Sequence, residues 1–417
     1  MKRIVAILLG VLLCGTSMAA DKVKVTVSNN QNFARSEELV EIPAVELRAK
    51  LDTQSALVVT DADGKEVTSQ LTWDGMLIFP VAIPAKGKAV YYVAAGTPAQ
   101  YESKVFGRQF PERVDDIAWE NDRVAFRCYG PALQKSGERA WGYDIWNKRT
   151  DKLVVNDRYA GELDPDIAKA VKKLRARGEN DLADDLYNAV SYHVDHGNGM
   201  DCYKVGPTLG AGTTAMLENG GKDIHYPKCY TSYEILDCGP LRFSVKLVYG
   251  LEKVDGNDVT EIRVVSLDAG SQMNKCVVAY FGLPKEAPIA TGIIVHNENP
   301  SAYVLNQKSG FMGYEDLGDP NQYKEKYRAK QNRDFGQIYV GTVFTQPKTS
   351  MEFRGGEGLP GACGHILAIS PYEGEYTYYF GSGWSRNPNT RFQTLGDWEA
   401  YLLRFSQQVQ NPLKVKF

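Results

Sequence analysis

The segment from Ser191 to Lys204 holds the densest group of side chains that can do chemistry. Two of the five histidines in the chain lie here, three residues apart. Histidine titrates nearest to neutral pH, so it serves as a general base, a general acid or a metal ligand. A neighbouring carboxylate can fix the tautomer of its ring, and Gly197 and Gly199 let the backbone bend sharply. We therefore interpret the segment as a functional loop. Its candidate residues are His193, Asp195, His196, Asp201, Tyr203 and Lys204.

A metal site in this loop is possible but not favoured. His193, Asp195 and His196 all carry ligand atoms. However, the spacing H-x-D-H is not a standard zinc pattern, and the helical motif H-E-x-x-H is absent from the sequence. We assign no metal ligand, and the cofactor stays unknown.

Further candidates lie elsewhere in the chain. Arg127 sits in an apolar run predicted to be a strand, where a charge needs a partner. The stretch from Trp141 to Trp146 concentrates aromatic side chains around Asp144, which suits either sugar stacking or ordinary sheet packing. His225 can join the two histidines of the loop. The remaining residues singled out here are Tyr143 and Trp384, the latter on the rim of a cleft. We interpret His296 and His365 as ordinary strand residues.

The elements that must position these residues are mostly strands. Lys22–Val27 alternates polar and apolar residues, as a half-buried strand does. From about Val114 onward, short strands recur with Gly- and Asn-rich connections, which favours an antiparallel sandwich over parallel βαβ units. One stretch differs: Asp164 and Pro165 can begin a helix, and apolar residues follow at helical spacing. The sequence predicts a helical hairpin over 164–190 that leads directly into the segment from Ser191 to Lys204, which we call the histidine loop.

The N-terminus predicts export. Lys2 and Arg3 precede a short apolar run and then Ser17-Met-Ala19, the pattern of a secretory signal over residues 1–19. The run is too short to span a bilayer. Lipidation at Cys14 is the alternative, but Leu13 stands where a small residue is wanted. We expect a periplasmic protein without membrane insertion. Removing two basic residues changes the formal charge from −3 to −5, and no clustered basic surface indicates nucleic-acid binding.

Several segments together resemble a known family. They are Trp119–Arg127, Tyr129–Pro131, Gly142–Trp146, Tyr192–Gly197 with Met200–Asp201, Leu209–Gly212 and Gly239–Arg242. The family is an uncharacterised-domain group of exported Bacteroidota proteins that accompany polysaccharide-utilisation enzymes, and some members look like ulvan oligosaccharide dehydratases. The resemblance covers nearly the whole mature chain. It implies an antiparallel β-supersandwich, similar to galactose mutarotases, over 110–417 with the helical insertion at 164–190. The strand and turn signals that precede Gly96-Thr-Pro98 predict a separate N-terminal β-domain over 20–100.

The resemblance also implies a reaction. A uronic acid at the non-reducing end of an oligosaccharide would lose a proton from C5 and water from C4, leaving a 4,5-unsaturated sugar. This lyase chemistry needs a group that neutralises the carboxylate, a base and an acid. The sequence offers Arg127, Tyr143, His193, His196 and Tyr203 for these parts, and their distribution stays open. The substrate contacts expected are Trp141, Asp144, Trp146, Asp195, Asp201, Lys204, His225 and Trp384.

Two other functions stay open at this point. A polysaccharide lyase or glycoside hydrolase would cleave the same glycan instead, and a hydrolase needs two carboxylates about 5–9.5 Å apart, which Asp144, Asp195 and Asp201 can supply. The other alternative is a non-catalytic glycan-binding protein. It predicts that Trp141 and Trp146 are exposed while the histidines are buried away from any cleft.

Overall fold

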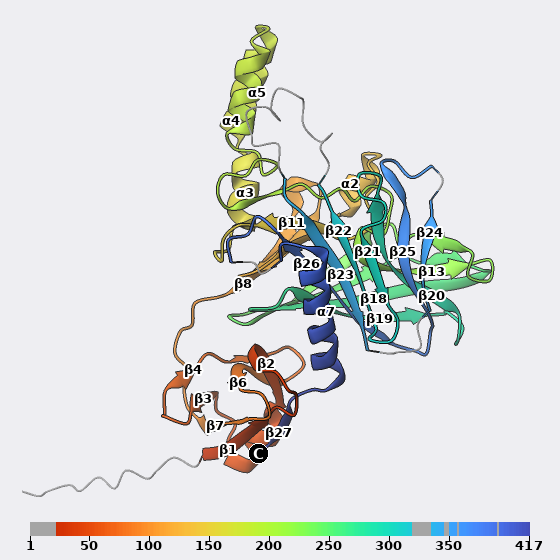
Figure 1. Cartoon of the computed structure of the whole chain (residues 1–417). Helices are drawn as coiled ribbons and strands as arrows, with labels where there is room; N and C mark the ends of the chain where they lie inside the picture. Colours follow the sequence, from red (N-terminus) through yellow and green to blue (C-terminus); the bar gives the residue numbers. More distant parts are fainter. Residues whose placement is uncertain (1–21, 319–334, 346–349, 357, 390–391) are drawn as a thin grey trace, which may run out of the picture.

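The computed structural model describes residues 22–318, 335–345, 350–356, 358–389 and 392–417 (Figure 1). The predicted signal segment 1–19 and Cys14 lie outside these residues. None of the helices in the described ranges is both long and apolar enough to cross a membrane.

The N-terminal part of the chain forms two small sheets around a core of its own. One sheet has the order β27-β1-β7-β3-β4, and the other has the order β2-β6-β5. Every second residue of β1 is buried, as its alternating sequence predicts. The bounds are β1 Lys22–Ser28, β2 Arg35–Pro43, α1 Ala44–Leu51, β3 Leu57–Asp61, β4 Glu66–Val67, β5 Gln70–Leu71, β6 Met76–Ile83 and β7 Lys88–Ala95.

The C-terminal strand β27 (Lys414–Lys416) completes the N-terminal sheet by pairing with β1. The two ends of the described chain therefore lie side by side in one sheet (Figure 1). The N-terminal unit, formed by β1 to β7 with β27, is thus connected to the rest of the chain, the sandwich, at two points: after β7 and before β27.

The sandwich begins with a five-stranded sheet of order β12-β11-β10-β9-β8. Its bounds are β8 Val105–Phe110, β9 Asp116–Asn121, β10 Ala125–Cys128, β11 Asp144–Lys148 and β12 Gly199–Asp201. The short helices around it are η1 Pro111–Arg113, α2 Pro131–Lys135 and α3 Val155–Glu162. The last strand of this sheet carries Asp201 and adjoins the histidine loop.

Two larger sheets complete the sandwich. The five-stranded one has the order β14-β13-β20-β25-β24, and the main path of the nine-stranded one is β15-β16-β18-β19-β26-β23-β22-β21. The bounds are β13 Ala211–Glu218, β14 Asp223–His225, β15 Tyr230–Cys238, β16 Arg242–Tyr249, β17 Glu252–Val254, β18 Asn257–Asp268, β19 Met273–Phe281, β20 Pro288–His296, β21 Tyr303–Asn306, β22 Phe311–Asp316, β23 Ile338–Phe344, β24 Ser350–Gly355, β25 Ala362–Pro371 and β26 Tyr376–Trp384.

The predicted antiparallel β-supersandwich is confirmed. The ladders between the described strands are antiparallel, for example β18 with β19 and β20 with β25. One large core joins buried residues of all three sandwich sheets, among them Trp119, Phe243, Ile293 and Phe380.

Two helices form the predicted insertion, α4 (Pro165–Ala176) and α5 (Asn180–Asn188). The carboxylate of Asp164 caps α4 by accepting hydrogen bonds from the backbone N–H groups of Asp166 and Ile167. The pair projects away from the sheets (Figure 1). Its chain continues directly into the loop that starts at Ser191.

The long helix α7 (Leu395–Gln410) was not expected from the sequence. It begins at a capping box between Thr394 and Asp397 and packs on β22 and β23. A Cβ atom added to Gly341 would lie 2.7 Å from Leu402, so glycine is what allows the helix to approach the sheet. The buried pair Trp398 and Leu402, four residues apart, is the sequence signal that indicates this helix.

Candidate functional site

The histidine loop has a fixed backbone. Oδ1 of Asp195 accepts hydrogen bonds from the N–H groups of Gly197 (2.8 Å) and Gly199 (3.0 Å). The buried guanidinium of Arg158 donates to the carbonyl oxygens of Asn147 (2.8 Å) and Asn198 (2.7 Å). Gly199 has a φ of 101°, and a Cβ atom there would lie 2.1 Å from the Asn147 oxygen. The loop is therefore held in one shape before any ligand binds.

The two loop histidines have different surroundings. Nδ1 of His193 lies 3.3 Å from the carbonyl oxygen of Asp201 and 3.6 Å from its carboxylate, and 28% of the side chain is exposed. His196 is exposed, and its Nε2 lies 3.1 Å from the carbonyl oxygen of Ser191. A carboxylate at Nδ1 orients the ring. His193 thus combines access with a partner suited to proton transfer.

Beneath His193 lies a buried ion cage around Arg127. Its guanidinium donates to Asp144 (Nε to Oδ2, 2.8 Å), Asp201 (2.8 Å) and the Tyr129 hydroxyl (2.9 Å), and Asp116 lies 3.8 Å away. Burial raises the pKa of Asp116 to about 6, and burial together with Asp201 raises the pKa of Asp144. The carboxylate of Asp201 belongs both to this cage and to His193.

The cage corrects the roles expected for Arg127 and Asp144. Only 4% of the Arg127 side chain is exposed, and its donors are occupied by the cage. Asp144 is fully buried on β11. The partners that the charge of Arg127 requires are thus the buried carboxylates of the cage. Neither Arg127 nor Asp144 can contact a substrate at the surface.

Two other arginines lie beside the loop. Oδ2 of Asp195 pairs with Arg149 at 3.2 Å and lies 3.7 Å from Arg386. Arg386, with 23% of its side chain exposed, lies over the ring of Trp384 at 5.6 Å. Trp384 itself is buried and donates from Nε1 to the carbonyl oxygen of Phe335 (2.7 Å). Trp384 is therefore not an exposed rim residue; the partly exposed side chain at this position is Arg386, which lies over the buried Trp384 ring.

A second histidine–carboxylate pair, His296 with Asp316, was missed by sequence reasoning. Nδ1 of His296 lies 3.1 Å from both carboxylate oxygens of Asp316, and the ring of Tyr203 lies edge-on at 5.8 Å. Burial lowers the pKa of His296, but Asp316 outweighs this, so its pKa is raised. The two partners end strands of different sheets, β20 and β22, so no spacing in the sequence indicates their contact. The hydroxyl of Tyr203 is buried, which raises its pKa well above the ordinary range.

Burial removes two further residues from the predicted site. Tyr143 is 1% exposed and stacks on Phe380 with ring centroids 4.2 Å apart. Trp146 is completely buried and packs against Tyr159 and Tyr192. Sheet packing was the alternative that the sequence left open for this aromatic stretch, and both side chains pack in the core.

Three other residues predicted to contact the substrate have different surroundings. Trp141 is half-buried against Tyr226, with ring centroids 4.9 Å apart. His225 pairs instead with Glu218 (3.3 Å) and Glu252 (3.7 Å) around β14. Lys204 is the last residue of the loop and is half-buried, with Nζ 2.7 Å from where a Cβ of Gly361 would stand. Among the described residues, no group of three or more His, Cys, Asp or Glu side chains is placed to hold a metal ion.

Comparison with known proteins assigns the family. The model of a domain of unknown function, DUF4861, matches residues 27–415. The chain belongs to the DUF4861 family. The uncharacterized protein P7 of Formosa agariphila is 25% identical over 413 residues, which cover 94% of this chain and 92% of that protein. The resemblance to an uncharacterised-domain family is thereby confirmed at the level of the family.

Two solved structures align with this chain at low similarity. They are an alpha-mannosidase from Enterococcus faecalis V583 and a protein in the glycosyl hydrolase family 38 from Enterococcus faecalis, each with a TM-score of 0.47 and 10% identity. The alignments cover 95% and 94% of this chain but 46% and 47% of those chains. The chain thus spans about half the length of these proteins.

Proposed function

We propose that this chain is an exported carbohydrate-active enzyme, a carbon–oxygen lyase that dehydrates uronate-containing oligosaccharides in the periplasm. The observation that carries the proposal is the pairing of His193 with Asp201. It places a partly exposed imidazole against a buried carboxylate, on a rigid loop next to Arg386 and Arg149. The sequence resemblance supplies the substrate class.

The reaction removes water across C4 and C5 of the terminal uronate. The C5 proton passes to His193, the C4–O bond breaks, and a C4=C5 double bond forms. The departing hydroxide receives a proton and leaves as water. We assign that proton donor to His196, because Tyr143 and Tyr203 are buried. General acid–base catalysis of this kind contributes roughly 10²–10⁴ in rate.

The carboxylate of the uronate must be neutralised while charge develops beside it. We assign this part to Arg386, with Arg149 beside it, in place of the buried Arg127. A guanidinium donates in a planar fork that matches a carboxylate. Asp195 holds both arginines at the loop.

The alternatives fit the geometry less well. A hydrolase needs two carboxylates facing each other across a substrate, whereas Asp144 and Asp201 are both buried against one guanidinium. A glycan-binding protein was expected to expose Trp146, which is completely buried. A chain-cleaving lyase would use the same groups, so the product must distinguish it.

The test incubates the protein with a panel of uronate-terminated oligosaccharides and follows absorbance near 230 nm and product mass. We expect unsaturated products that have lost water. Replacing His193 by Ala should lower kcat by roughly 10²-fold or more at an unchanged thermal midpoint. Replacing Arg386 by Gln should lower kcat as well as raise KM, because the guanidinium is assigned both to binding the carboxylate and to neutralising the charge that develops beside it.

The matched control is His225→Ala, because His225 pairs with Glu218 and Glu252 away from the loop. Its turnover should stay close to that of the wild type. Full turnover in both His193→Ala and His196→Ala would end the proposal for this loop. Cleaved products that have gained water would identify a hydrolase instead.

A further inference from the structure

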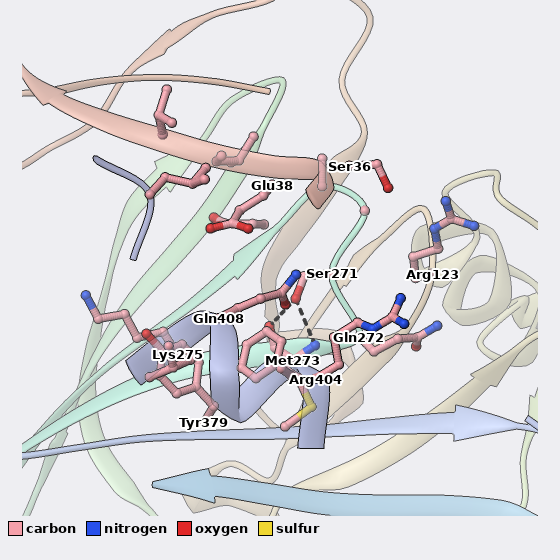
Figure 2. A pocket seen from close by; sticks show the side chains of 18 of the residues that line it. Ser36, Glu38, Arg123, Ser271, Gln272, Met273, Lys275, Tyr379, Arg404 and Gln408 are labelled. Atoms are coloured by element: carbon pink, nitrogen blue, oxygen red, sulfur yellow. Dashed lines mark hydrogen bonds between the residues drawn. The ribbon is translucent and has the colours of Figure 1, made fainter. Parts of the chain in front are cut away.

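A cavity of about 590 Å³ lies between the N-terminal unit and the sandwich, apart from the histidine loop (Figure 2). Its volume falls within the roughly 300–1,000 Å³ of small-ligand sites, which are common at domain interfaces. Residues of β2 line one side, and residues of α7, β19 and β26 line the other. Figure 2 shows Ser36 and Glu38 on the β2 side, facing Gln272, Tyr379 and Arg404.

Ion pairs and hydrogen bonds hold the two walls in place. Arg242 on β16 donates to Glu41 on β2 (2.6 Å) and to both oxygens of Asp268 (2.6 and 2.8 Å). Arg35 on β2 is almost completely buried, pairs with Glu38, and donates to the carbonyl oxygen of Asn411 at 2.7 Å. The pairing of β27 with β1 adds a backbone connection. The cavity is therefore formed before a ligand enters, which reduces the entropic cost of binding.

The charges of the lining favour an anion. The two carboxylates on the β2 side, Glu38 and Glu41, already face the guanidinium groups of Arg35 and Arg242. On the opposite side, the exposed cations Lys275 and Arg404 add positive charge. Asp268, the third carboxylate of the lining, shares Arg242 with Glu41, and Arg123 adds a further cation. A carboxylate or sulfate group entering the cavity would thus meet cations while the acidic side chains are paired.

The remaining lining suits a ring that carries hydroxyl groups. Tyr379, Tyr401 and Phe405 form a continuous aromatic row, with centroids 5.2 Å apart for Tyr379 and Phe405 and 6.1 Å apart for Tyr401 and Phe405. Aromatic faces and edges of this kind pack against sugar rings. Hydroxyl and amide groups around them can exchange hydrogen bonds with a sugar, and they belong to Ser36, Ser271, Gln272 and Gln408.

We propose that this cavity is an accessory binding site for an acidic oligosaccharide, separate from the site of bond breaking. The choice of a uronate sugar rests on the proposed function, whereas the preference for an anionic, hydroxyl-bearing ligand rests on the lining. Such a site would hold a longer chain while its end reacts elsewhere or on another molecule. It predicts binding that weakens as salt is added, since exposed cations are screened.

The test measures binding by calorimetry with tetrasaccharides prepared from ulvan, alginate, pectin and chondroitin, and with the neutral cellotetraose. The double variant Lys275→Gln/Arg404→Gln removes two exposed cations, and Ser36→Trp fills the cavity. Both should weaken binding of at least one acidic tetrasaccharide by tenfold or more. The matched control Lys172→Gln/Arg177→Gln removes the same charge from exposed positions at α4, and its Kd should stay within twofold of the wild type.

Three results would overturn this site: no acidic tetrasaccharide binds, binding is equally strong in the cavity variants, or only the neutral sugar binds. The failure of the proposed function looks different. If the His193 assignment is wrong, His193→Ala keeps full turnover while binding still depends on the cavity. If the cavity assignment is wrong, turnover still depends on His193 while the cavity variants bind like the wild type.

Discussion

Replacing Arg127 by Met is expected to destabilise the sandwich strongly, because three buried carboxylates surround its guanidinium. Asp144 and Asp201 accept its hydrogen bonds, and Asp116 lies 3.8 Å away. Methionine fills a similar volume but offers no charge. The carboxylates would then face one another without the cation that compensates them.

The magnitude follows from the burial of every partner. Only 4% of Arg127 is exposed, and each of the three carboxylates is at most 1% exposed. Removing one partner of such a buried pair costs about 3–5 kcal/mol of the free energy of unfolding. The exposed pair of Arg149 with Asp195 provides the contrast, because Arg149 is 42% exposed. Arg149→Met should cost less than about 1 kcal/mol.

The cost should depend on pH in a definite direction. Burial already raises the pKa of Asp116 from 3.8 to about 6, and Arg127 lowers it. Without Arg127, the pKa values of Asp116 and Asp144 rise further above those of the unfolded chain. A carboxyl whose folded pKa lies above its unfolded value destabilises the fold above the folded pKa, and the loss disappears as the pH falls through it. Arg127→Met should therefore lose less stability at pH 5 than at pH 8.

The assay is urea unfolding at both pH values, followed by tryptophan fluorescence. Trp146 is a useful probe because its ring lies 5.1 Å from the Arg127 guanidinium. The reasoning is refuted if Arg127→Met loses no more stability than Arg149→Met at pH 8. It is also refuted if the loss grows as the pH is lowered.

Three further predictions concern single contacts. Gly199→Ala should lower the free energy of unfolding by about 3 kcal/mol or more, because the added Cβ meets the Asn147 oxygen. Gly197→Ala has open space around its Cβ and a φ of 92°, and should cost about 1 kcal/mol. The midpoints of urea unfolding compare the two variants. Asp201→Asn should lower kcat about 10²-fold and shift the pH–rate profile, and an unshifted profile would contradict its link to proton transfer. Burial lowers the pKa of His365 to about 4 from 6.5. The contribution of His365 to the free energy of unfolding should therefore fall by up to about 3 kcal/mol between pH 6.5 and 4. Urea unfolding of the wild type and of His365→Gln over this range should differ by this contribution.

Local patterns predicted the parts of the fold that local chemistry determines. The alternation in Lys22–Val27 corresponds to β1 with every second side chain buried. Asp164 caps a helix where its side chain and Pro165 predicted one. The helix α7 escaped prediction, although its capping box and its apolar spacing are both visible in the sequence. It packs on the sheet at Gly313 and Gly341. A glycine in a strand does not by itself indicate that a helix packs on that position.

The site was predictable only where its parts are neighbours in the sequence. Asp195 caps the N–H groups of Gly197 and Gly199, all within five residues. The pairing of His296 with Asp316 joins ends of different sheets, and the position of Arg386 beside Asp195 depends on a contact across 191 residues of chain. Aromatic and charged residues in a strand alternate in the same way whether they face a ligand or a core. Tyr143, Trp146 and Arg127 were therefore indistinguishable from binding residues before the sheets were assembled.

The position of Asp201 explains why a buried cage lies directly under an exposed histidine. A carboxylate that orients an imidazole must itself stay in one place, and a loop residue has few means of achieving this. Asp201 ends β12, which pairs with β11, and Oδ2 of its carboxylate accepts a hydrogen bond from Arg127. The same oxygen lies 3.6 Å from Nδ1 of His193. Asp201 is thus the side chain that connects the buried ion cage to the ring of His193. The orientation of this ring in the surface loop therefore depends on the core of the sandwich.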